Sequence, residues 1–274
     1  MISGALAMSL FLGCGRGIEY EGGPGAQTET AAPTVVACGD ESTWSEGYRV
    51  EGVVSDIETG AALAAGLCAT AIDPTPAVTG GDPTLLASAA VCEDGRFVIA
   101  GLTEAPAIGL FIGIDDCDNT VADTVMNAAT GVSAEEIEGK GDGDAVSGVV
   151  AVVVRREVEA QWATDLAYAG SLEGDGFLAG FILDVGEQPV SGAQIDCSGC
   201  AEDYYLDADA SDGLFGTASG FNPSSDAAAG AMFLLPAAPV FTFTCADGGA
   251  HTWENRLFGS VPGIGAFIDF TAVE

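Results

Sequence analysis

The chain has 274 residues, of which 41 are Asp or Glu and only 7 are Lys or Arg, so its formal net charge is −34. This length fits two modest domains, and a hydrophobic fraction of 48% is sufficient for packed cores. The charge argues against nucleic acid as a partner, because phosphate binding requires clustered Lys or Arg. We interpret the scattered acids as a solvated shell screened by salt; carboxylate cages for divalent cations are the alternative.

Residues 1–13 predict a signal peptide. The apolar run over residues 2–12 is shorter than the roughly 20 residues that span a bilayer, but it fits the core of a secretory signal. The sequence Phe11-Leu12-Gly13-Cys14 resembles the lipobox of bacterial lipoproteins, which implies a lipid on Cys14 and the membrane as a partner through that anchor. An ordinary secretory signal is the alternative. The lipobox resemblance implies the bacterial outer membrane, cell surface or periplasm.

Residues 14–47 are rich in Gly, Thr and Glu and show no sustained period, which predicts a flexible tether. A first β domain is then expected at residues 48–120. It opens with an alternating strand at 48–56, and short apolar strands follow between turns rich in Gly, Pro and Asp. This spacing is typical of an antiparallel β-sandwich.

A helical connecting segment is expected at residues 121–174. Val150, Val154, Val158, Trp162 and Leu166 lie four residues apart, as along one face of a helix. The β-branched run VVAVVV could instead form a strand and leave the helix to begin at Arg155.

Residues 175–274 repeat the cues of the first domain in the same order. GFLAGFILD at 176–184 matches the first strand, and APVFTFTC at 238–245 stands where APAIGLFI stood. The repeat predicts one module used twice, with a long insert between Cys200 and Ala229 in the second copy.

These motifs resemble the carboxypeptidase regulatory-like domain family. Its opening G-x-V-x-D cue appears as Gly52–Asp56 and as Gly180–Asp184; Pro189–Ala193 and Asp94–Leu102 supply later cues. The resemblance implies a mainly β fold of two transthyretin-like antiparallel β-sandwiches with an inter-domain helix. It implies no catalysis, because this module accompanies peptidases without carrying their zinc ligands.

Outside the cytoplasm the cysteines after Cys14 should largely be paired. We expect Cys68 to bond Cys92, Cys38 to bond Cys117, and Cys245 to bond either Cys197 or Cys200. One cysteine of these seven is then left over. The spacing C-x-x-C at Cys197 and Cys200 favours a structural disulfide over a redox or zinc site, because no helix start or second ligand pair accompanies it.

The sequence offers no catalytic constellation. His251 is the only histidine, and we interpret it as a solvated loop residue because no serine elbow or zinc motif accompanies it. No cofactor is expected, apart from a structural calcium ion that two acidic clusters could hold. These clusters are Asp115, Asp116 and Asp118, and Asp207, Asp209 and Asp212. Solvated turns are the favoured interpretation of both.

The predicted function is therefore non-enzymatic: a surface or periplasmic lipoprotein that serves as an interaction, scaffold or adhesion module with a protein or glycan partner. The alternative is a calcium-dependent carbohydrate or ligand binder, or an accessory subunit of a secreted hydrolase. Tyr204, Tyr205 and Phe221 are candidates for an exposed ligand platform, since scaffolds carry function on their longest loops.

Overall fold

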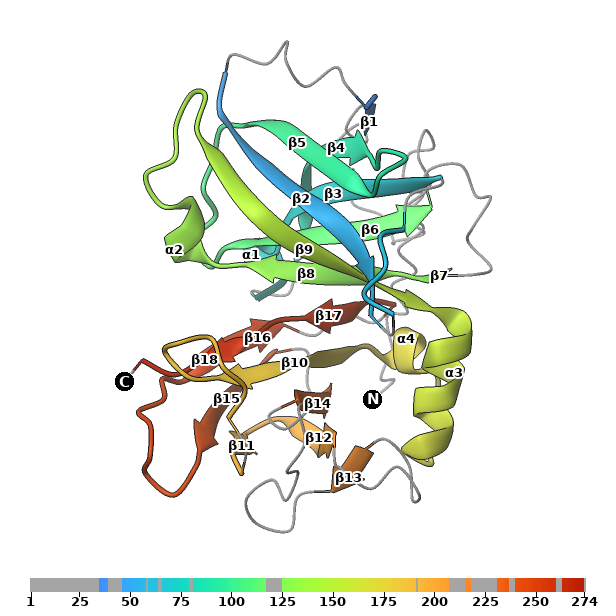
Figure 1. Cartoon of the computed structure of the whole chain (residues 1–274). Coiled ribbons are helices and arrows are strands. Elements are labelled where there is room, and N and C mark those ends of the chain that lie inside the picture. The colour runs from blue at the N-terminus through green and yellow to red at the C-terminus, as the bar shows by residue number, and fades with distance from the viewer. Residues whose placement is uncertain are drawn as a thin grey trace, which may run out of the picture. The chain divides into compact units, whose positions relative to one another are not determined.

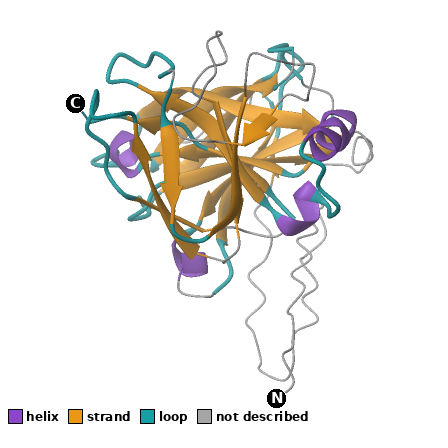
Figure 2. Cartoon of the chain, turned by 90° about the horizontal axis from the view of Figure 1, so that it is seen from below, coloured by secondary structure: helices purple, strands orange, loops and turns teal. Residues whose placement is uncertain are grey.

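The structure is a computed structural model that describes residues 35–38, 46–57, 59–63, 66–78, 81–116, 125–190, 192–206, 215–217, 231–236, 240–259 and 263–273. Strands make up most of this described chain, and the helices are short (Figure 2). None of the helices in these ranges is long and apolar enough to cross a membrane. The chain divides into two compact units, Met1–Arg156 and Glu157–Glu274.

The first unit contains two sheets (Figure 1). One has the strand order β1-β4-β3-β6-β8 and the other the order β5-β2-β9-β7. The strands are β1 (Val35–Val36), β2 (Tyr48–Asp56), β3 (Leu67–Asp73), β4 (Thr84–Ala90), β5 (Arg96–Leu102), β6 (Leu110–Asp116), β7 (Val125–Met126), β8 (Ala128–Val132) and β9 (Ala145–Arg155). Two one-turn helices, α1 (Thr75–Val78) and α2 (Ala134–Ile137), join them.

Apolar residues of both sheets form one core in the first unit. Alternate residues of β2 and β5, including Val50, Val54, Phe97 and Ile99, are at most 1% exposed. They belong to the same cluster as Ile112 of β6. Because two sheets bury one face each against this cluster, the first unit is a β-sandwich.

The second unit also contains two sheets. Strands β17-β10-β14-β12-β13 follow one another in the first, where β18 also pairs with β10, and the second has the order β11-β15-β16. The elements are α3 (Arg156–Asp165), α4 (Leu172–Asp175), β10 (Phe177–Leu183), β11 (Gln194–Cys197), β12 (Cys200–Leu206), β13 (Phe215–Thr217), β14 (Ala231–Pro236), β15 (Val240–Ala246), β16 (Arg256–Gly259), β17 (Gly265–Phe267) and β18 (Phe270–Thr271).

The two units share a scheme of strand pairing. The opening strand, β2 or β10, pairs antiparallel with β5 or β14 on one edge. On its other edge it pairs parallel with the closing strands, β9 in the first unit and β17 and β18 in the second. The expectation of purely antiparallel sandwiches is therefore wrong, because each unit closes with a parallel strand.

The aspartates at the ends of the two G-x-V-x-D cues close equivalent turns. The Asp56 N–H donates to the Ala61 carbonyl at 2.9 Å, and the Asp184 N–H donates to the Gln188 carbonyl at 2.8 Å. Each carboxylate also accepts a backbone N–H of its own turn, from Thr59 at 2.8 Å and from Gly186 at 2.7 Å. These residues therefore act in the turn, as Asp commonly does.

The glycines of the same cues lie where the closing strand comes close to the opening strand. A Cβ atom on Gly52 would lie 2.1 Å from the Val149 carbonyl oxygen, and one on Gly180 would lie 1.8 Å from the Ile268 carbonyl oxygen. Any side chain there would displace backbone, which explains why glycine stands at both positions.

The prediction that one helical face runs from Val150 to Leu166 is wrong in its first half. Residues up to Arg155 form β9, and Val150 is 51% exposed on that strand. The β-branched run pairs with β2, so tertiary pairing outweighs the helical spacing. The alternative, a helix that follows the strand, is confirmed by α3, whose Trp162 packs edge-on against Phe177 at 6.0 Å between ring centroids.

Part of the predicted tether is attached to the first unit. Val35 and Val36 pair parallel with Ser88 and Ala89 of β4. A disulfide between Cys38 and Cys92 then fixes the same segment to the residue that follows β4 by two positions. The predicted lipidation residue Cys14 lies outside the described residues.

Candidate functional site

The outer face of the sheet β11-β15-β16 is polar. Residues alternate along β11 and β15, so that Ile195, Phe243 and Cys245 are buried. Asp196, next to Ile195, and Thr242, next to Phe243, are exposed. This alternation is the pattern of a strand with one face on the core and the other on solvent.

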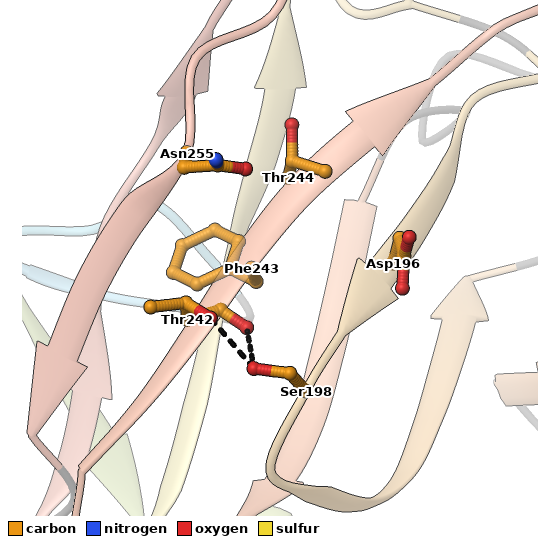
Figure 3. Close-up of a pocket in the computed structure, with 6 residues that line it drawn as sticks. All are labelled: Asp196, Ser198, Thr242, Phe243, Thr244 and Asn255. Atoms are coloured by element: carbon orange, nitrogen blue, oxygen red, sulfur yellow. Dashed lines mark hydrogen bonds between the residues drawn. The ribbon is translucent and has the colours of Figure 1, made fainter.

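A hollow of about 170 Å³ opens on this face. Figure 3 shows that its polar side chains come from β11 and β15, from the residue just after β11 and from the residue just before β16. Its lining consists of Asp196, Ser198, Thr242, Phe243, Thr244 and Asn255. Three hydroxyls, one carboxylate and one amide therefore converge on a single shallow depression.

Only some of these polar groups bond to each other. The hydroxyls of Ser198 and Thr242 share a hydrogen bond of 2.6 Å, and the Thr244 hydroxyl donates to the Glu254 carbonyl at 3.4 Å. The side chains of Asp196 and Asn255 have no hydrogen-bond partner in the described part of the chain. The hollow thus presents a free acceptor and a free amide to an incoming ligand, and no cationic group to attract an anion.

His251 lies in the loop between β15 and β16 and is held there. Its Nδ1 contacts the Asp247 carboxylate, and its ring packs edge-on against Trp253 at 5.8 Å. Burial raises the pKa of Asp247, but hydrogen bonds from the His251 ring and backbone outweigh burial and leave that pKa below its ordinary value. The Trp253 indole N–H also lowers this pKa, although it makes no hydrogen bond of ordinary geometry. His251 therefore stabilises its loop instead of projecting freely into solvent.

We expect Asp247→Asn to destabilise the second unit by about 1.5 kcal/mol at pH 7, because a charged acceptor of loop hydrogen bonds is lost. Since the folded pKa of Asp247 is lowered, the contribution is present above the unfolded pKa of about 3.9 and is lost as the pH falls through the folded pKa. Urea titrations between pH 3 and 7 measure the difference from the native chain. The exposed Asp82→Asn is the control; a difference that grows towards pH 3 contradicts the assignment.

The predicted aromatic platform is wrong for two of its three residues. Tyr204 is 7% exposed and Tyr205 is 0% exposed. The Tyr205 hydroxyl accepts the Ile195 N–H at 2.5 Å and donates to the Asp203 carboxylate at 3.0 Å. Tyr205 therefore joins β12 to the edge strand β11. Phe221 lies outside the described residues.

The disulfide pairings expected from the sequence are also wrong. Cys92 bonds Cys38, Cys197 bonds Cys200, and Cys68 is disulfide-bonded as well. In the pairing of β3 with β4, Cys68 lies opposite Ala90 and not opposite Cys92. The parallel pairing of β1 with β4 instead brings Cys38 to Cys92. Cys245 is free and buried opposite Ile195, and burial raises the pKa of its thiol to about 12. Cys117 lies outside the described residues.

The structure describes two of the six residues of the predicted calcium clusters, Asp115 and Asp116. Asp118, Asp207, Asp209 and Asp212 lie outside the described residues, and Asp115 is 7% exposed on β6, beside Asp116. Within the described ranges no group of three or more His, Cys, Asp or Glu residues could hold a metal ion.

We expect the melting temperature of the chain to rise with NaCl and with CaCl₂ alike at matched ionic strength. Screening shortens the Debye length from about 10 Å at 0.1 M to about 3 Å at 1 M and so relieves the repulsion of an acidic shell. Differential scanning calorimetry with a chelator control measures the effect. A rise that occurs only in calcium, and saturates, would replace this interpretation with specific sites.

Sequence reasoning from motifs missed the hollow. Apart from Ser198 in the C-x-x-C sequence, its residues belong to no functional motif, and Asp196 and Ser198 lie more than 40 positions before Thr242 along the chain. The one local signal is Thr242-Phe243-Thr244, where two hydroxyls flank a core residue. That alternation predicts a polar outer face, but it does not show which strands lie beside it.

No family model and no curated protein matches the chain. Among solved structures, the Bacillus anthracis TIE protein is similar over 82% of this chain at 13% identity and a TM-score of 0.25. The chain spans 33% of that protein. The shaft pilin spaA from Lactobacillus rhamnosus GG is similar over 84% of this chain and 98% of its own, at 8% identity and a TM-score of 0.25. These scores are too low to assign the fold family or the function.

Proposed function

We propose that the protein is a non-enzymatic surface lipoprotein that adheres to a neutral glycan through the outer face of β11-β15-β16. The observation that carries the proposal is the hollow on that face, where Asp196 and Asn255 offer unpaired polar groups. Vicinal sugar hydroxyls both donate and accept, so they complement a carboxylate, an amide and several hydroxyls. The net charge of −34 opposes an anionic ligand.

The pairing scheme common to both units supports a duplicated module of the transthyretin-like, carboxypeptidase regulatory-like type. In both, the second strand, β3 or β11, pairs antiparallel with β6 or β15, which in turn pairs antiparallel with β8 or β16. The units differ in the strand that follows the second strand along the chain. In the first unit this strand, β4, pairs with the second strand, β3, whereas in the second unit it is β12, which pairs with β14. The second unit therefore departs from the first beside the face that carries the hollow.

Disulfides support a location outside the cytoplasm, where such bonds persist. The first unit has the Cys38–Cys92 bond and the second has Cys197–Cys200. A lipid on Cys14 would then hold both units near a membrane, at the outer membrane, the cell surface or in the periplasm.

Binding of the chain to a printed array of neutral and acidic glycans tests this function. We expect retention on neutral glycans. The double variant Asp196→Ala with Asn255→Ala should lose this retention at least tenfold, whereas Asp82→Asn, which removes an exposed carboxylate of the first unit, should keep it. Equal retention of the two variants, or none by the native chain, would contradict the proposal.

A further inference from the structure

The strand by which the second unit is attached to the preceding chain lies inside a sheet. β10 follows α4 directly, and it pairs with β14 on one edge and with β17 and β18 on the other. The antiparallel ladder joins residues 178–181 to residues 231–234. The parallel ladder extends from Phe177 opposite Gly265 to Leu183 opposite Thr271. One edge of the attachment strand is therefore held at residues 178–181, and the other at residues 177–179 and 182–183.

A pull along β10 loads these ladders together. Hydrogen bonds of a ladder lie across the strands, so a lengthwise pull strains every bond at the same time, whereas a pull that separates the strand ends breaks one pair after another. The closing strands add bonds of their own: the Ile268 N–H donates to the Ala179 carbonyl and the Ala272 N–H donates to the Leu183 carbonyl, each at 2.9 Å.

Side-chain packing also opposes sliding of β10. Phe177 stacks on Phe233 at 4.7 Å between ring centroids and meets Phe267 edge-on at 5.7 Å. A slip of one residue would exchange the two faces of the strand, and it would separate Phe177 from both of these rings. The Ile268 carbonyl fits only over Gly180, which has no side chain.

We propose that the second unit is a load-bearing module, in which tension along the chain is resisted by shear of the ladders on both edges of β10. The inference rests on the proposed function, because a lipid-anchored protein that adheres through this unit transmits tension through residues 157–176. The parallel pairing of β10 with β17 and β18 then keeps the outer face of β11-β15-β16 folded while the chain is pulled.

The test stretches the full chain at constant force through two pairs of attachment points. Handles on Ser171 and Val273 pull the N-terminal end of β10 against the C-terminal end of β18, which is shear. Handles on Val185 and Val273 pull the C-terminal ends of the same two strands apart, which is peeling. Both valines are exposed, at 63% and 41%. We expect the second unit to unfold at least about tenfold more slowly in the first geometry; equal rates would overturn the proposal.

A matched pair of proline variants separates shear from general destabilisation. Ala272→Pro removes the N–H that bonds Leu183 in the parallel ladder, and Ser198→Pro removes the N–H that bonds Thr242 at 3.0 Å in the β11–β15 pair. With handles on Ser171 and Val273, the unfolding rate should rise about tenfold for Ala272→Pro and little for Ser198→Pro. Equal increases would overturn the proposal. These rates do not depend on glycan binding, so their failure is distinguishable from failure on the array.

Discussion

Gly180→Ala is expected to destabilise the second unit by about 4 kcal/mol, because the new methyl group collides with backbone that cannot rotate away. The Cβ atom would lie 1.8 Å from the Ile268 carbonyl oxygen and 2.6 Å from its carbon. Relief requires β17 and β18 to move off β10, which breaks the parallel ladder. Gly52→Ala should act in the same way on the first unit, where the Val149 carbonyl is 2.1 Å away.

Gly141→Ala is the matched control, since nothing lies within 4 Å of a Cβ atom there. Chemical denaturation followed by fluorescence measures each variant. We expect Gly141→Ala to change the free energy of unfolding by less than about 0.5 kcal/mol. A Gly180→Ala chain as stable as this control would show that the closing strands do not lie where the structure has them.

Removal of the Cys38–Cys92 bond should destabilise the first unit by about 4 kcal/mol, or roughly 10 °C in melting temperature. The bond joins residues 54 positions apart, and a loop of that length restricts the unfolded chain strongly. The variant is Cys38→Ser with Cys92→Ser. Loss of the bond also frees the end of β1, whose two residues pair with β4.

The Cys197–Cys200 bond provides the comparison, because its residues are only 3 positions apart. The same loop argument gives about 2 kcal/mol for Cys197→Ser with Cys200→Ser. Calorimetry of both double variants measures the two effects. A smaller loss for the Cys38 pair than for the Cys197 pair would contradict the pairing of β1 with β4.

The opening strand of each module was predictable from sequence, because its alternation is local. The expected strand at 48–56 is confirmed as β2, and that at 176–184 is confirmed as β10, Phe177–Leu183. The turn aspartates Asp56 and Asp184 were predictable for the same reason, since their bonds reach only a few residues along the chain.

Features that join distant segments were not predictable. Period-two alternation is the same for parallel and antiparallel partners, so it could not reveal that β9 lies parallel to β2. The Cys38–Cys92 bond depends on a two-residue strand in a segment rich in Gly and Thr. The hollow depends on the lateral order of β11, β15 and β16, which no single strand contains.

The central claim is that each module closes with a strand parallel to its opening strand. In the first unit the closing strand is β9, so the fold ends at Arg155 and not at residue 120, the boundary expected from the sequence. The most direct measurement compares the thermal melts of two fragments, residues 35–156 and residues 35–120, by circular dichroism. We predict a cooperative melt for the longer fragment and none for the shorter, which lacks β8 and β9. A cooperative melt of residues 35–120 at the same temperature would contradict the account.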